Sequence, residues 1–345
     1  MINLSENINF LYPNQETINE FKNSIELINN YPELKNIKLN KLVANQLDVL
    51  DNQLIITNGS LEAIDYFFKL NSQKTIGILQ PTFWGYENCA VRNGCKVKAV
   101  KMRNPFEFTL MEIVHLLKET DAIVLCNPNN PSLAHMPLKD IEYLLRKFPN
   151  KNILIDETVL TFDEKYNTNS TKKLVNTYKN LFVCFSYSKI LGIPGLRLGV
   201  LISNEDNINS VKHQIIPYSL GILPQIYLAQ NYNLFPVNKE ISNNIQNNFN
   251  YLIGKLPKGI VSNVVNKNYG FILIQFHPNV ILDDLCLYLI EKEILVRNVT
   301  EAYKELGKNW IRISSGNISD YERLIRAIYE YLEKKGEKIG IYSEE

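Results

Sequence analysis

The sequence predicts an α/β protein with a mostly parallel sheet covered by helices on both faces, followed by a smaller α+β domain. Three observations lead to this fold class. Apolar segments alternate with helical segments through residues 54–203, which is the pattern of strands joined by helical crossovers. The strand segments are apolar almost throughout, as strands are when both faces of their sheet are buried. Polar turns follow these strands, and in such sheets ligands bind at the carboxyl ends of the strands.

The elements of the large domain follow from these patterns in order. Residues 1–15 are expected to form an irregular arm, and residues 16–30 and 34–48 two helices separated by Tyr31-Pro32. Apolar runs predict strands at 54–57, 75–79, 96–100, 122–126, 152–155, 181–185 and 196–202. Apolar residues at helical spacing predict helices at 61–70, 83–92, 110–118 and 138–146.

The pattern changes after about residue 230, which predicts a second domain. Its expected helices are 236–256, 281–292 and 319–334, and its expected strands are 260–265, 271–276, 294–297 and 310–314. We therefore expect an arm and helix at 1–30 that packs on the small domain or on a partner subunit, a large domain at 31–230 and a small domain at 231–345. The tail at 337–345 is expected to be loosely held.

Composition and charge argue against several classes of function. The 345 residues are 45% hydrophobic and 21% charged with a net charge of +1, so nothing in the charge balance attracts nucleic acid or a membrane surface. The start lacks a signal-peptide pattern, and no apolar run reaches the length of a membrane span. Five scattered cysteines fit buried free thiols, and four histidines show no ligand spacing. We therefore expect a cytoplasmic protein without a metal site.

Lys189 is the residue around which the chemistry is organised. It lies in a Gly/Pro-containing connection between two buried strands, where an unpaired ammonium would be costly. Such a lysine is explained if it binds the aldehyde of a cofactor, pyridoxal phosphate, as a Schiff base. Asp156 ends another apolar strand, and a carboxylate there can keep the ring nitrogen of the cofactor protonated. The alternative role for Asp156 is to cap the following helix.

A phosphate site is predicted at Arg197, Ser186 and Gly59-Ser60. Arginine binds phosphate through two parallel hydrogen bonds. The backbone amides after Gly59 open a helix, and the positive end of a helix favours an anion. A Gly-Ser turn is also a common helix start, which is the alternative explanation for this pair.

Phe83 and Asn130 are predicted to contact the cofactor ring. Phe83 follows a strand end, where a planar aromatic group can stack on the ring, although it can also be a core residue. Asn130 precedes Pro131 and is expected to donate a hydrogen bond to the ring hydroxyl. The alternative for Asn130 is a turn, which Asn/Pro clusters favour.

Two arginines of the second domain are predicted to bind substrate. Arg312 lies among apolar strand residues, so its charge requires an anion, and the candidate anion is the α-carboxylate of the substrate. Arg297 ends another apolar run. Structural ion pairs are the alternative for both residues.

The ordered set of motifs resembles the fold-type I pyridoxal phosphate enzymes. The set is Gly59-Ser60, Pro81–Phe83, Asn127–Pro131, Asp156-Glu157, Ser186–Lys189, Arg197 and Arg312–Gly316. Within these enzymes the chain is similar to the class I/II branch that holds histidinol-phosphate aminotransferase and threonine-phosphate decarboxylase. The resemblance covers nearly the whole chain, and it implies the aminotransferase fold type I and a homodimer with its site at the subunit interface.

The resemblance also assigns roles to further residues. It implies that Ser188 joins Ser186 at the cofactor, and that Tyr31 reaches the cofactor phosphate of the partner subunit. The branch implies a phosphorylated substrate, whose second anion is assigned to Arg297, helped by Asn7 or Asn9 of the arm.

The sequence does not decide between the aminotransferases and the decarboxylases of this branch, because some of its residues resemble one group and some the other. Histidinol-phosphate aminotransferases generally carry a ring-bonded Tyr where this chain has Val159, and the decarboxylases can also lack that Tyr. Gly316 resembles the aminotransferases, because the decarboxylases tend to place a second arginine there. Three segments look closer to the decarboxylases, namely Ser5–Asn9, Pro81–Glu87 and Ile193–Gly199.

The expected function is that of a pyridoxal phosphate-dependent aminotransferase acting on a small, phosphorylated amino acid or amino alcohol. In this reaction Lys189 moves a proton from the α carbon of the substrate to the C4′ carbon of the cofactor. The alternative is a decarboxylase of an O-phospho amino acid of the phosphothreonine or phosphoserine type. Lys189 serves either reaction, so the choice rests on the residues that hold the substrate.

Overall fold

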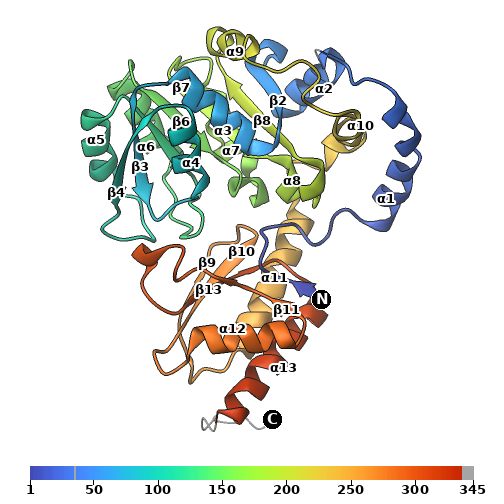
Figure 1. Cartoon of the computed structure of the whole chain (residues 1–345), viewed down its shortest axis with the longest axis vertical. Helices are drawn as coiled ribbons and strands as arrows, with labels where there is room; N and C mark the ends of the chain where they lie inside the picture. The colour runs from blue at the N-terminus through green and yellow to red at the C-terminus, as the bar shows by residue number, and fades with distance from the viewer. Residues whose placement is uncertain (35, 336–345) are drawn as a thin grey trace. The chain divides into compact units, whose positions relative to one another are not determined.

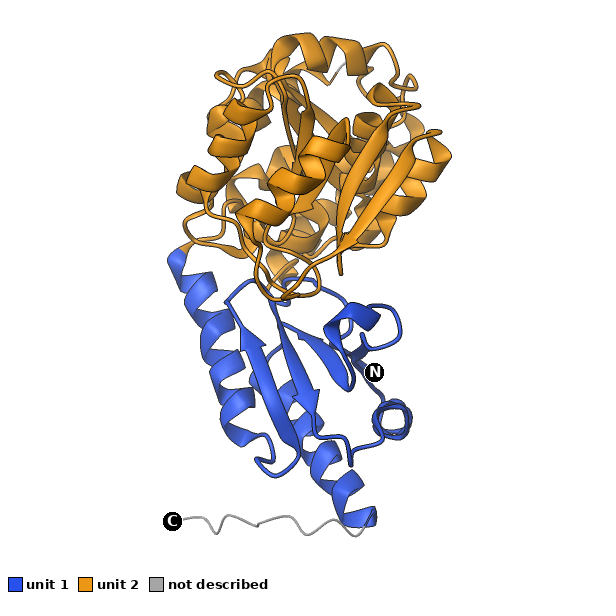
Figure 2. Cartoon of the chain, turned by 90° about the vertical axis from the view of Figure 1, so that its left-hand side faces the viewer, with its two compact units in different colours: residues 1–10, 239–345 blue, residues 11–238 orange. Residues whose placement is uncertain are grey.

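The computed structural model describes residues 1–34 and 36–335, which divide into two compact units (Figure 2). The larger unit is Leu11–Asn238, and the smaller unit joins Met1–Phe10 to the chain from Lys239 onward. The boundaries expected after residues 30 and 230 therefore differ from those of the compact units. Only the first ten residues of the expected arm belong to the small unit, and the expected tail at 337–345 lies outside the described residues.

A seven-stranded sheet in the order β2-β8-β7-β6-β5-β3-β4 forms the centre of the large unit (Figure 1). Strands β7, β6, β5, β3 and β4 are parallel to one another, whereas β8 is antiparallel to both β7 and β2. The mostly parallel sheet is thus confirmed. The strands are β2 (Leu54–Asn58), β3 (Thr75–Gln80), β4 (Lys96–Lys101), β5 (Ala122–Cys126), β6 (Asn152–Asp156), β7 (Leu181–Ser186) and β8 (Leu198–Ser203).

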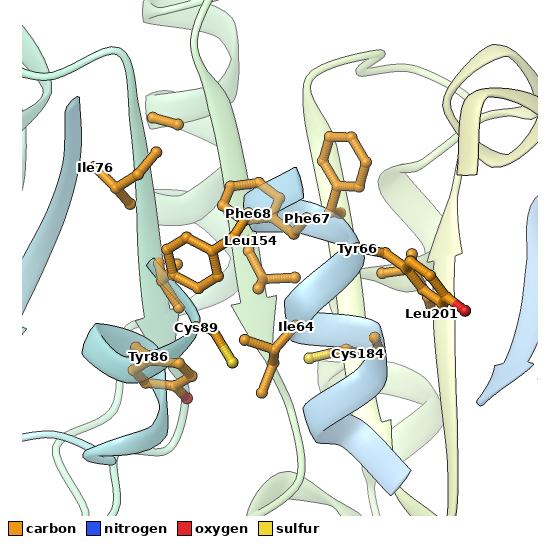
Figure 3. Close-up of a cluster of buried hydrophobic side chains, with 14 of the residues drawn as sticks. Ile64, Tyr66, Phe67, Phe68, Ile76, Tyr86, Cys89, Leu154, Cys184 and Leu201 are labelled. Carbon is orange, nitrogen blue, oxygen red and sulfur yellow. The ribbon is translucent and has the colours of Figure 1, made fainter. Parts of the chain in front are cut away.

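Helices cover both faces of this sheet, as β3 demonstrates. Successive side chains of a strand point to opposite faces. Ile76 and Ile78 belong to the buried cluster that helices α3 and α4 form against one face (Figure 3). Gly77 lies between them and faces α5, because a Cβ atom on Gly77 would lie 2.7 Å from Leu116 Cγ. The helices are α3 (Gly59–Leu70), α4 (Gly85–Arg92), α5 (Leu110–Glu119) and α6 (Leu138–Lys147).

Several helices of the large unit differ from the sequence prediction. The helix expected at 16–30 is wrong in its second half, because α1 ends at Lys22 and a separate 3₁₀ turn spans Ile25–Asn29. Lys189 lies in a one-turn helix rather than a loop. The remaining helices are α1 (Gln15–Lys22), α2 (Ile37–Leu47), α7 (Tyr166–Asn169), α8 (Tyr187–Ile190), α9 (Glu205–Lys212) and α10 (Ile222–Asn231).

The small unit is the expected α+β domain. Its antiparallel sheet has the order β12-β13-β10-β9, and the short strand β1 pairs in parallel with β11. The strand expected at 294–297 is two strands in different sheets. The elements are β1 (Ile2–Asn3), α11 (Lys239–Lys255), β9 (Val261–Asn266), β10 (Phe271–Phe276), α12 (Leu282–Glu291), β11 (Ile294–Leu295), β12 (Arg297–Asn298), β13 (Trp310–Ser314) and α13 (Ile318–Lys334).

Two further findings bear on the expectations from composition. All five cysteines are free, and four of them are buried. Within residues 1–34 and 36–335, the helices are too short or too polar to cross a membrane.

Gly77 gives a direct test of the packing between β3 and α5. We expect Gly77→Ala to lower the free energy of unfolding by about 1–3 kcal/mol, because the added methyl group overpacks a buried interface. The control is Gly195→Ala, since a Cβ atom on Gly195 meets nothing within 4 Å. Urea unfolding of both variants measures the difference, and equal stabilities would contradict the described packing.

Candidate active site

Asp156 is a buried carboxylate held by two neutral donors. It is the last residue of β6, and its side chain is only 4% exposed. The hydroxyl of Tyr86 donates to Oδ2 at 2.8 Å, and the backbone N–H of Thr158 donates to Oδ1 at 2.9 Å. Cys126 of β5 and Cys184 of β7 flank Asp156 in the sheet. The side chain therefore lies at the carboxyl edge of the parallel strands, in surroundings that disfavour its charge.

Burial raises the pKa of Asp156 above its ordinary value of 3.8, while the hydrogen bonds from Thr158 and Tyr86 act in the opposite direction. The adjacent Glu157 is also buried, and burial raises its pKa too. Glu157 has a structural role, because it accepts hydrogen bonds from Ser170 Oγ at 2.6 Å and from Thr171 Oγ1 at 2.7 Å. The two carboxylates therefore share burial and neutral donors, but only Asp156 ends a strand at the edge where Lys189 follows the next strand.

Lys189 follows β7 at the same edge of the sheet, and its side chain is half-buried. The two serines before it bind the backbone of β8. Ser188 Oγ donates to the carbonyl of Leu198 at 3.2 Å and accepts from its N–H at 2.9 Å. Ser186 Oγ donates to the same carbonyl at 3.3 Å. These bonds fix α8 against the start of β8, and a contact of either hydroxyl with a cofactor stays a prediction.

Gly59 and Arg197 form a cradle at the start of α3. Gly59 has φ +73°, a conformation that favours glycine, and a Cβ atom on it would lie 2.6 Å from Arg197 Nη2, so a side chain there would displace the guanidinium. Gly199 of β8 is required for a similar reason, because its Cβ atom would lie 2.5 Å from the backbone nitrogen of Ser60. The first turn of α3 and an arginine therefore converge, as they do in phosphate sites.

Phe83 and Asn130 lie on two loops that Asn129 fastens together. Asn129 is 1% exposed. Its Nδ2 donates to the carbonyl of Pro81 at 2.7 Å, and its Oδ1 accepts from Thr82 Oγ1 at 2.7 Å. The loop after β5 is thereby tied to the loop after β3, so the half-buried side chains of Phe83 and Asn130 are held at the same edge as Asp156.

Arg312 and Arg297 are directly opposite each other in the antiparallel pair of β13 and β12. Like charges in this position destabilise a sheet. The pKa of Arg312 is lowered to about 10, mainly by burial and in smaller part by the nearby Arg297, while Tyr303 and Glu6 act in the opposite direction. The Arg312 guanidinium lies over the ring of Phe271, 5.4 Å from its centroid, and Nη2 donates to the carbonyl of Ser5 at 2.8 Å.

The N-terminal arm lies along the same strand of the small unit. The carbonyl of Leu4 accepts from the N–H of Ser314 at 2.9 Å, and the carbonyl of Ile8 accepts from Ser315 Oγ at 2.9 Å. Asn9 is fully buried next in the chain. Asn7 is 8% exposed, and its Oδ1 lacks a hydrogen-bond partner among the described residues.

Tyr31 lies on the surface of the large unit. Its side chain is 85% exposed, and its ring centroid is 5.4 Å from that of Tyr218. Leu34 and Ile216 are exposed apolar neighbours that line a groove of about 540 Å³ together with Tyr218. The groove also has polar lining residues such as Glu33 and Lys212, and exposed apolar side chains rimmed by polar ones are typical of a surface that another molecule covers.

Sequence reasoning missed three residues that build this edge, namely Tyr86, Asn129 and Gly199. Each acts through a partner far away in the chain, such as Asp156 for Tyr86. The sequence carries only weak signals for them: Tyr86 lies in the Pro81–Glu87 segment, Asn129 lies in the Asn127–Pro131 segment, and Gly199 interrupts an apolar strand.

The fold and this arrangement of lysine, aspartate and arginine define an enzyme of the fold-type I class. The family model for aminotransferase class I and II matches residues 1–328. The histidinol-phosphate aminotransferase of Francisella philomiragia is 30% identical over an alignment of 313 residues that covers 88% of this chain and 84% of the relative. The chain therefore belongs to the aminotransferase class I and II family, and it is a transaminase of the pyridoxal phosphate-dependent kind.

Solved structures share the fold over nearly all of the chain. The histidinol-phosphate aminotransferase from Clostridium acetobutylicum has a TM-score of 0.85 at 22% identity, covering 97% of this chain and 100% of the other. The L-threonine-O-3-phosphate decarboxylase from Porphyromonas gingivalis has a TM-score of 0.83 at 21% identity, covering 96% and 100%. The histidinol-phosphate aminotransferase from Sinorhizobium meliloti, solved with pyridoxal-5'-phosphate, has a TM-score of 0.84 at 14% identity, covering 97% and 91%.

The raised pKa of Asp156 predicts a pH dependence of the cofactor-free protein. A carboxyl group with a raised pKa contributes stability that is fully present below its unfolded value of 3.8 and is lost as the pH rises through its folded pKa. We therefore expect Asp156→Asn to stabilise the cofactor-free protein at neutral pH and to have a smaller effect near pH 4. Urea midpoints measured across this range provide the test. A variant whose midpoints run parallel to those of the wild type would contradict the raised pKa.

Proposed function

We propose that the chain transfers the amino group of a small phosphorylated amine, either an amino acid or an amino alcohol, in the manner of histidinol-phosphate aminotransferase. The observation that carries this proposal is the opposed pair Arg297–Arg312, because two adjacent guanidinium groups suit an anion of high charge. The names of the relatives, with histidinol phosphate as their substrate, support the same chemistry.

The residues at the sheet edge fit pyridoxal phosphate. Gly59 provides a cradle that a Cβ atom would fill, beside the guanidinium of Arg197, which suits the phosphate of the cofactor. Asp156 is buried with neutral donors only, so it suits a cationic ring nitrogen. Phe83 would cover one face of the ring, and Asn130 would donate to its hydroxyl. Ser186 and Ser188 would add to the phosphate contacts.

Lys189 would hold the cofactor and then move the proton. When bound, the cofactor supplies an electron sink for the pair left by the broken bond at the substrate α carbon. The amine of Lys189 would act as the general base that takes the proton from that carbon and as the general acid that returns it on the cofactor side. Asp156 would hold a negative charge beside the ring nitrogen, which would maintain the sink. Asp156 and Lys189 are therefore the proposed catalytic residues.

The small unit would supply the anion contacts. An anion between Arg297 and Arg312 would relieve their mutual repulsion, and the buried Arg312 would gain the most from it. Asn9 remains a proposed substrate contact. Asn7 is a second candidate, because a ligand N–H or O–H could satisfy its buried Oδ1.

A decarboxylase of an O-phospho amino acid is the second candidate function. The Val159 side chain, 2% exposed, lacks the hydroxyl expected of an aminotransferase in this branch. Gly316 favours the transaminase. A Cβ atom on Gly316 would lie 2.8 Å from Leu4 Cδ2 and 3.3 Å from the ring of Tyr321. The arm thus fills the space that the second arginine of the decarboxylases would need.

We further propose a homodimer in which Tyr31 serves the cofactor of the partner subunit. The support is the 85% exposure of Tyr31 and the apolar groove lined by Leu34, Ile216 and Tyr218. A second copy of the chain would bury this surface, and Tyr31 would then reach the phosphate across the interface.

Product analysis tests the choice of reaction. With histidinol phosphate and 2-oxoglutarate, the enzyme is expected to form glutamate, whereas phosphothreonine and phosphoserine release no carbon dioxide. Arg312→Lys should lower kcat/KM by about tenfold or more, because lysine loses the bidentate contact. Lys189→Ala is the control for background chemistry. Release of carbon dioxide without an oxo product would overturn the transaminase in favour of the decarboxylase.

Mixing two inactive variants tests the contribution of Tyr31. Tyr31→Ala and Lys189→Ala should each be nearly inactive alone. If Tyr31 acts on the partner's cofactor, each mixed dimer contains one intact site out of two. Random pairing makes about half of the dimers mixed, so co-expression should restore about a quarter of the wild-type activity.

Asp156→Ala with Lys189→Ala is the matched control for this mixture. Both residues belong to the same sheet edge of one chain, so no mixed dimer has an intact site. Rescue in the control, or its absence in the Tyr31 mixture, would contradict the proposed role of Tyr31.

A further inference from the structure

Tyr86 connects two groups that the proposed function places at the cofactor. It lies in the first turn of α4, and its side chain is fully buried in the cluster between α3, α4 and the sheet (Figure 3). We infer that the Tyr86 hydroxyl is a positioning group for Asp156, which keeps the shared proton on the cofactor's ring nitrogen rather than on the carboxylate. This inference rests on the proposed use of pyridoxal phosphate.

The geometry at the carboxylate supports this role. Tyr86 Oη donates to Oδ2 of Asp156 at 2.8 Å, and the N–H of Thr158 donates to Oδ1 at 2.9 Å. One donor at each oxygen fixes the plane of the carboxylate and leaves further lone pairs for the ring N–H. Both donors stabilise the ionised form and make the carboxylate a weaker base. A weaker base beside the ring nitrogen leaves the proton on the nitrogen.

Tyr86 also packs against Phe83, the aromatic residue proposed to cover the cofactor ring. The ring centroids of Tyr86 and Phe83 are 5.5 Å apart with an interplanar angle of 86°, an edge-to-face contact. Phe83 also lies against Gly85, whose Cβ atom would be 2.4 Å from Phe83 Cε1. One turn of α4 therefore fixes the stacking ring and the carboxylate together.

The hydroxyl of Tyr86 stays a donor at working pH. Burial and the charge of Asp156 raise the pKa of Tyr86 well above its ordinary value of 10. Tyr86 therefore keeps its proton, which excludes it as a general base and leaves hydrogen-bond donation as its contribution.

The test is Tyr86→Phe, which removes the hydroxyl and keeps the ring that packs against Phe83. In the cofactor-free variant, the carboxyl of Asp156 should titrate at higher pH in ¹³C NMR, because the ionised form has lost a donor. In the loaded variant, ¹⁵N NMR of labelled pyridoxal phosphate should show the ring nitrogen shifted toward its unprotonated form. We expect kcat to fall about tenfold, as for loss of a hydrogen bond to a charged group.

Tyr178→Phe is the matched control. Tyr178 Oη donates to Glu142 Oε1 at 3.0 Å, and it precedes the amino end of β7, at the edge opposite to Asp156. The Tyr178→Phe variant also loses a hydrogen bond from a tyrosine hydroxyl to a carboxylate, but it should leave both NMR signals unchanged. If Tyr86→Phe and Tyr178→Phe give the same spectra, Tyr86 is merely structural and the inference fails. If the wild type binds no pyridoxal phosphate, the proposed function itself fails, which is a distinguishable result.

Discussion

The buried carboxylate of Asp156 is the constraint on which the rest of the site depends. Its side chain is 4% exposed and receives hydrogen bonds from neutral groups, Tyr86 and Thr158. A carboxylate in such surroundings pays for its charge in desolvation and is stable when a cation joins it. A ligand that carries a protonated ring nitrogen supplies that cation. In the proposed function, part of the affinity for the cofactor would therefore come from the pairing of this carboxylate with a cation.

Topology brings the other groups to this carboxylate. Asp156 and Lys189 follow neighbouring parallel strands, so their chain direction alone places them at one edge. Arg197 reaches the same edge because β8 runs in the opposite direction and begins where β7 ends. Two glycines, Gly59 and Gly199, then remove the side chains that would keep α3 away from β8. The site thus follows from strand direction and from close backbone contact, with few residues needed for the chemistry itself.

The sequence predicted those features that stand out from their local surroundings, such as a charged residue next to an apolar strand. Asp156 was proposed because a charged residue ends an apolar strand, and Lys189 because it lies in the connection between two buried strands. The strands of the large unit were placed to within a few residues of their observed bounds, whereas the short strand Ile2–Asn3 was expected to be irregular. The roles of Tyr86 and Asn129 were not predicted, because their hydrogen-bond partners, Asp156 and Pro81, lie 70 and 48 residues away in the sequence. A hydrogen bond across that separation leaves no local pattern. The prediction of one helix at 16–30 was wrong in its second half for a simpler reason, because the periodic spacing of apolar residues continues past Lys22, where the helix ends.

The most direct test of the central claim compares pyridoxal phosphate with the analogue in which the ring nitrogen is replaced by C–H. The analogue keeps the aldehyde and the phosphate but cannot pair with Asp156. We expect the wild type to bind pyridoxal phosphate at least about tenfold more tightly than the analogue, because the analogue cannot form the charge-assisted hydrogen bond to Asp156. The Asp156→Asn variant should bind both with similar affinity. Equal binding of the two compounds by the wild type would contradict the account.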